Sequence, residues 1–286
     1  MSLGVFDDIE NNSDEAINKL LKSLSETNET LYSEFESLVS TLEKTPAGLI
    51  KASPGNMRLI SSFDGKFDAI IKTTPYYKES ISFIKSYSEN TKLINSYFKA
   101  FDGFNPKNAI YETVLETNVE ITVNSLLESG INEYFKTPLT NSLRLSVFEG
   151  TSKTDLLKSL RAELLGTVDR KPRLERYIQQ VSTDAINQFN GNYIGTISND
   201  LGLSHYFYKG TKMEETRPFC VHLTGKYMKE VQLREYVTKE SSGKGWTGMI
   251  PGTNFGNILT RRGGYNCRHT IIPVSKAVYE AAKNKL

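Results

Sequence analysis

The strongest constraint on the fold is a run of residues spaced alternately by four and three between positions 17 and 42. Seven of its eight members are apolar, namely Ile17, Leu21, Leu24, Leu31, Phe35, Leu38 and Leu42, and the eighth is Asn28. In an α-helix this spacing brings all eight onto one stripe. Ser13 or Asp14 can cap the start of such a helix, and Thr-Pro-Ala-Gly at 45–48 ends it. The stripe needs partner helices, either from the same chain or from another subunit.

Similar apolar stripes extend over most of the chain before residue 203. They predict helices at 57–72, 76–101, 110–130, 138–148 and 172–197. Another helix is expected after Ser152, because Ser152 and Asp155 have the spacing of a capping box, and Gly166 ends it. The first two hundred residues are therefore predicted to be mainly helical.

The pattern changes after residue 202. Residues 203–208 and 270–273 predict short strands, whereas 227–237 and the residues after Ser275 predict helices. Glycine is frequent between them, with seven among the 22 residues from Gly243 to Gly264, which is typical of loops. We therefore predict an α+β fold, with a mainly helical N-terminal region followed by a small, loop-rich α+β module. The expected division is 1–150 as a helical protein-contact region, 151–202 as a helical connector and 203–286 as a basic module containing the cysteines.

The composition is that of an ordinary folded protein. It is 38% hydrophobic and 24% charged, unlike that of chains that stay disordered. The first residues are acidic, and no stretch approaches the roughly 18 apolar residues of a membrane span, so we expect neither export nor membrane contact. Two cysteines are too few for a disulfide framework, which favours synthesis in a reducing cytoplasm.

The charges are unevenly distributed although the net charge is only +2. Residues 203–286 contain 14 lysines and arginines against six acids, a balance of +8, and the preceding residues contain 21 against 27, a balance of −6. A basic module of this kind suits contact with DNA or with an acidic protein surface. The candidate contact residues are Arg217, Lys226, Arg261, Arg262 and Arg268.

Both cysteines and two of the three histidines lie in Cys-x-His pairs, Cys220 with His222 and Cys267 with His269. In extended segments, residues i and i+2 point to the same side, so two such strands could offer four ligands to one tetrahedral zinc ion. The spacing within each pair is shorter than is usual in structural zinc sites. Buried thiols with nearby hydrogen-bonded histidines are therefore an alternative, and a Cys220–Cys267 disulfide formed after cell lysis is another.

Familiar catalytic patterns are weak. Cys267 with a histidine could form a nucleophile and its base, and His222 with His269 could serve a small hydrolase or nuclease. No orienting carboxylate or oxyanion hole is marked for the first, and few acids lie near the second. The glycines at 243–248 lack the flanking strand and helix of a phosphate-binding loop. The pattern does not favour an enzyme.

From Arg176 onward, the order of segments resembles that of the phage head-morphogenesis family, the Mu F-like minor head proteins. The segments are a helix at 176–187, an aromatic strand, Glu-Thr-Arg-Pro-Phe-Cys at 215–220, Gly-Lys at 225–226, a glycine-rich insert with Trp246, and Gly-Tyr-Asn-Cys-Arg-His at 264–269. The positions that match the family pattern are Thr216, Arg217, Cys220, Asn266, Cys267, Arg268 and His269. The chain departs from that pattern at Ser-Thr-Asp 182–184, where a basic triplet is usual, and at Glu214–Glu215, where aspartate is usual.

The resemblance covers about the last two fifths of the chain and implies a minor virion protein without established enzymatic activity. Such a protein is made in the host cytoplasm and acts at the portal vertex or inside the head. The implied partners are portal and other virion proteins, packaged DNA, and further copies of the chain in an oligomer. A nucleic-acid-binding protein that depends on the basic module is the remaining alternative.

Overall fold

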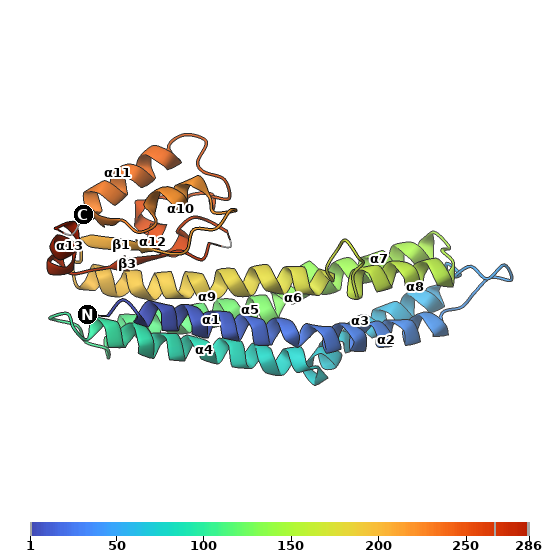
Figure 1. The fold of residues 1–286 in the computed structure, drawn as a ribbon. Coiled ribbons are helices and arrows are strands. Elements are labelled where there is room, and N and C mark those ends of the chain that lie inside the picture. Colours follow the sequence, from blue (N-terminus) through green and yellow to red (C-terminus); the bar gives the residue numbers. More distant parts are fainter. Residues whose placement is uncertain (1, 266, 285–286) are drawn as a thin grey trace. The chain divides into compact units, whose positions relative to one another are not determined.

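The computed structural model describes residues 2–265 and 267–284 (Figure 1). The chain forms two compact units, each assembled from separated stretches of sequence. Unit 1 comprises Met1–Ser13, Tyr87–Val119 and Thr183–Leu286, and unit 2 comprises Asp14–Ser86 and Glu120–Ser182. Four long helices contribute residues to both units, so the units are interleaved along the chain and differ from the consecutive segments 1–150, 151–202 and 203–286.

The four shared helices are α1 (Val5–Lys22), α4 (Pro75–Phe98), α5 (Ala109–Leu127) and α9 (Arg173–Asp200). The other elements of unit 2 are α2 (Leu24–Thr41), α3 (Pro54–Thr73), α6 (Ser129–Ile131), the π-helix η1 (Asn132–Lys136), α7 (Thr137–Phe148) and α8 (Lys153–Leu164). Each helix predicted before residue 203 has a counterpart here.

The apolar stripe of residues 17–42 is used inside unit 2. All of its members except the half-buried Leu21 are buried, and α2 packs against α3 and α8. The structure divides the predicted helix at Ser23 into α1 and α2 and begins it at Val5, so the expected cap at Ser13 or Asp14 is wrong. The helix starts earlier because Phe6 and Ile9 extend its buried face.

The predicted cap of α8 is confirmed. The Ser152 hydroxyl accepts a hydrogen bond from the backbone N–H of Asp155 at 3.1 Å and donates to the Asp155 carboxylate at 2.6 Å. The chain after α8 turns at Gly166, whose φ of +81° is readily adopted by glycine. Local sequence signals therefore set both ends of this helix.

Unit 1 carries a three-stranded antiparallel sheet in the order β2-β1-β3. The strands are β1 (His205–Lys209), β2 (Tyr227–Lys229) and β3 (Thr270–Pro273), and the accompanying elements are α10 (Pro218–Leu223), α11 (Glu230–Ser241), the 3-10 helix η2 (Phe255–Asn257), α12 (Ile258–Arg261) and α13 (Lys276–Lys283). The predicted α+β fold, with a helical N-terminal region and a small C-terminal module, is confirmed. The helix predicted at 227–237 starts only at Glu230, because its first three residues pair with β1.

The C-terminal module packs on the last turns of α9 within unit 1 (Figure 1). Gly191 lies so close to α12 that an added Cβ would meet the Leu259 carbonyl oxygen at 2.3 Å. The Thr260 hydroxyl donates to the Asn192 amide oxygen at 2.6 Å next to this contact. From α4, the Tyr97 hydroxyl donates to the Pro273 carbonyl at the end of β3 at 2.7 Å.

Within the described ranges, none of the helices combines the length and the apolar character needed to cross a bilayer.

Candidate metal centre

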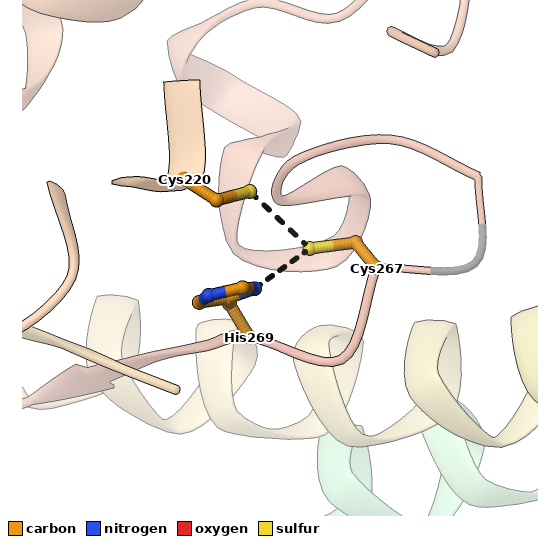
Figure 2. Close-up of side chains that lie close together, drawn as sticks. All are labelled: Cys220, Cys267 and His269. Carbon is orange, nitrogen blue, oxygen red and sulfur yellow. Dashed lines mark hydrogen bonds between the residues drawn. The ribbon is translucent and has the colours of Figure 1, made fainter. Parts of the chain in front are cut away.

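Cys220, Cys267 and His269 converge inside the C-terminal module (Figure 2). The two Sγ atoms are 3.8 Å apart, and the Cys267 Sγ lies 3.8 Å from the His269 Nδ1. One potential ligand atom from each residue lies within 4.8 Å of the other two. The side chains are 2%, 3% and 7% exposed, respectively, so the cluster is sealed from solvent.

The loop that leads into β3 explains why Cys267 and His269 share the cluster. It is not helical, so its alternate side chains can point to the same side, as the Cys-x-His spacing predicts for an extended segment. His269 is followed directly by β3, which pairs with β1 in the sheet. Gly210 after β1 packs on the imidazole so closely that an added Cβ would meet the ring at 2.1 Å.

Cys220 reaches the cluster from α10 rather than from a strand. Phe219 and Leu223 on the same helix are buried in the module core, which fixes the side of α10 that faces inward. The Tyr208 hydroxyl of β1 donates to the Cys220 Sγ at 3.3 Å. The thiol is thus held between its helix and the sheet.

His222 is the one member of the predicted set of four that the structure leaves outside the cluster. On a helix, residues i and i+2 point about 200° apart, so Cys220 and His222 face opposite ways. The exposed His222 ring stacks on Tyr236 at 4.6 Å between centroids, and its Nε2 lies 3.2 Å from the Lys226 Nζ. The expected strand geometry of this pair is therefore wrong, and so is the expected fourth ligand.

A glycine supports both sulfur atoms. The backbone N–H of Gly263 donates to the Cys267 Sγ at 3.3 Å. A Cβ at this position would lie 2.3 Å from the Cys220 Sγ and 2.9 Å from the Cys267 Sγ. The close approach of the thiols to this backbone therefore requires glycine, and the Gly-Gly pair at 263–264 is the sequence signal that could have indicated it.

The loop around Gly263 is fastened by two large side chains. Arg217 donates through Nη1 to the Gly263 carbonyl at 3.2 Å and through Nη2 to the Tyr265 carbonyl at 2.5 Å. Trp246 donates to the same Gly263 carbonyl at 2.8 Å and stacks on Phe219 at 4.0 Å. Both side chains hold the segment that carries Cys267.

The two thiols form one interacting pair. Their mutual hydrogen bond is the main cause that raises the pKa of Cys220, and burial raises it further. The same hydrogen bond is the main cause that lowers the pKa of Cys267, with His269 and Arg262 adding to the effect and burial opposing it. Negative charge therefore develops first on Cys267.

Arg262 supplies positive charge beside the pair. Its guanidinium donates to the His269 carbonyl at 3.1 Å, and the side chain is only 5% exposed. Burial lowers the pKa of Arg262, while the nearby Cys267 is the strongest influence in the opposite direction. A buried cation of this kind is stabilised by a nearby thiolate.

The five basic residues expected to meet DNA or an acidic partner have different environments. Lys226 and Arg268 are exposed. Arg261 is half-buried and donates to the Pro251 carbonyl at 2.5 Å, and Arg217 is half-buried and engaged as described. Arg262 is buried inside the module, so its guanidinium serves the interior rather than a partner surface.

No family model, curated protein or solved structure matches the chain.

Several residues that match the phage head-morphogenesis pattern nevertheless lie close together in the fold. Arg217, Cys220, Cys267 and His269 all lie in or directly beside the cluster, and the Thr216 hydroxyl accepts a hydrogen bond from the Met213 N–H at 2.7 Å. Asn266 lies outside the described residues. The sequence did not point to Tyr208 or Gly210, whose contacts with the cluster arise from the folding of β1 next to β3.

The donor set of two thiols and one imidazole is that of a zinc site rather than of a calcium or magnesium site. A nucleophile and base could also be built from Cys267 and His269, but both are buried. The buried arrangement suits a site that stabilises the module better than one that acts on a substrate.

Proposed function

We propose that this chain is a non-enzymatic structural protein of a bacteriophage particle, a minor head protein at the portal vertex or inside the head. The observation that carries the proposal is the convergence of four family-like residues: Cys220, Cys267 and His269 form one buried cluster, and the half-buried Arg217 holds the loop beside it. Residues that build an interior define a fold, so the proposal carries the family's role over to this chain by analogy of fold.

The same geometry weighs against the enzyme alternative. His222 and His269, the pair required by that alternative, belong to different environments, one exposed on α10 and one buried in the cluster. Cys267 and His269 are 3% and 7% exposed, and a substrate would need access to both. A structural role does not require access from solvent to either residue.

The charge distribution supports contacts with other components of a particle. The module has a balance of +8, and its exposed cations include Lys226 and Arg268. Cations of this kind attract phosphate groups and acidic protein surfaces. Packaged DNA and an acidic face of a portal or neighbouring virion protein are the partners that we propose, with an oligomer as the working form.

The test is quantitative mass spectrometry of density-purified particles from the phage culture that produces the protein. We expect the chain at a fixed copy number in full particles. Its presence in lysed cells together with its absence from washed particles would contradict the proposal.

A His269→Gln variant separates structure from catalysis. A structural role predicts reduced incorporation into particles together with reduced solubility of the chain. A well-folded variant that enters particles normally, yet loses a hydrolytic activity present in the parent, would favour the enzyme alternative. His205→Gln is the matched control, because His205 belongs neither to the cluster nor to the histidine pair of the enzyme alternative.

A further inference from the structure

We propose that Cys220, Cys267 and His269 bind one zinc ion, which ties α10 to the loop before β3. A water molecule completes the four ligands. The site follows from side-chain geometry alone and does not rest on a role in virions.

The spacing of the donor atoms matches tetrahedral zinc. Zn–S bonds of about 2.3 Å at tetrahedral angles place two sulfurs about 3.8 Å apart, and a Zn–N bond of about 2.0 Å places nitrogen and sulfur about 3.5 Å apart. The observed distances are 3.8 Å between the two Sγ atoms and 3.8 Å between the Cys267 Sγ and the His269 Nδ1. The third pair, the Cys220 Sγ and the His269 nitrogen, lies within 4.8 Å, so the side chains must close by up to about 1 Å when the ion binds.

The groups around the two sulfurs are hydrogen-bond donors and a cation, which stabilise thiolate ligands. The Gly263 N–H and the Tyr208 hydroxyl each donate to one sulfur, at 3.3 Å in both cases, as outer partners of zinc thiolates do. The buried Arg262 guanidinium, whose Nη1 donates to the His269 carbonyl at 3.1 Å, places a positive charge beside the cluster. On binding, the thiol protons leave to solvent, and two thiolates neutralise the dication.

Burial assigns the ion a structural role. Zinc enzymes keep an open ligand position accessible to substrate, whereas all three protein ligands here are at least nine-tenths buried. Cys220 and Cys267 are 47 residues apart in sequence, so the ion would close a long loop of chain. We expect the folded module to be more stable with zinc than without it.

The test measures metal content of the full chain purified under reducing conditions without chelator, by elemental analysis and native mass spectrometry. We expect about one zinc per chain for the parent and for the His222→Gln control. Cys267→Ser and Cys220→Ser should each lose at least nine-tenths of this zinc. A parent chain that holds no zinc as purified and takes up none from one equivalent of zinc sulfate would overturn the proposal. So would zinc loss in the control, or retention of iron or copper in place of zinc.

A second measurement on the parent chain avoids dependence on the folding of the cysteine variants. Titration with a mercurial thiol reagent in the presence of a colorimetric zinc indicator should release the ion as the two thiols react. Zinc that remains bound after both thiols are modified would exclude these residues as its ligands.

Discussion

The packing of the module on α9 can be tested with two glycines one turn apart. At Gly191, an added Cβ would lie 2.3 Å from the Leu259 carbonyl oxygen and 2.7 Å from the Thr260 Cα. At Gly195, the nearest atoms are the Leu259 side chain at 3.8 Å, an ordinary contact distance. Gly191→Ala should therefore destabilise the module, and Gly195→Ala should not.

The expected magnitude follows from two opposing effects. Alanine in place of glycine inside a helix stabilises it by about 1 kcal/mol, and this gain is common to both variants. At Gly191, the α12 backbone must move by about 1 Å to restore a normal distance, and overpacking of this kind costs about 1–3 kcal/mol. The two variants should thus differ by about 1–3 kcal/mol in the free energy of unfolding.

The chain offers a convenient probe for this comparison. Trp246 is its single tryptophan and is 8% exposed in the module core, stacked on Phe219. Urea unfolding followed by tryptophan fluorescence therefore reports on the module. Equal midpoints for Gly191→Ala and Gly195→Ala, or a more stable Gly191→Ala, would show that the close approach of α12 to α9 is wrong.

Substitutions at three further residues test other contacts. Ser152→Ala removes the cap of α8 and should cost about 1 kcal/mol in urea unfolding, whereas Ser152→Asp should retain most of the stability. Arg217→Lys loses the paired hydrogen bonds to the loop around the cluster and should cost about 1–3 kcal/mol, so unchanged stability would contradict its fastening role. Burial, the main cause, raises the pKa of Tyr177 to about 12, so its neutral phenol contributes stability below about pH 10 that is lost as pH rises through 12. Tyr177→Phe should therefore lose less stability than the parent over this interval, and equal losses in chemical denaturation at pH 9 and 12 would refute the assignment.

Local sequence signals were sufficient to predict features that depend on residues close together in the chain. Ser152 predicted a cap because capping depends on residues within one turn, and the regular apolar spacing of residues 17–42 predicted which side of α1 and α2 is buried. The start of α1 was missed because the burial of Phe6 and Ile9 depends on partner helices far along the chain.

The candidate site was predicted in part for the same reason. Cys267 and His269 share one side of an extended segment, which their spacing alone indicates. Cys220 and His222 have the same spacing, but Pro218 starts a short helix there and turns the histidine outward. The Gly-Gly pair at 263–264 signals a close approach to the backbone, but no spacing rule shows that Cys220, 43 residues earlier in the chain, makes that approach.

The sequence could not predict that the two units are interleaved along the chain. Composition and charge change near residue 202, which suggested a boundary there. However, α9 ends at Asp200 and packs its last turns against the following module, so Thr183 and the residues after it belong to the same unit as β1. A boundary inside a regular helix leaves no break in apolar periodicity.

The most direct test of the zinc centre is X-ray absorption at the zinc K edge of the full chain as purified. We expect a shell of two sulfurs at about 2.3 Å and two nitrogen or oxygen atoms at about 2.0–2.1 Å. A shell without sulfur, or one with four sulfurs, would contradict a centre built from Cys220, Cys267 and His269 of one chain.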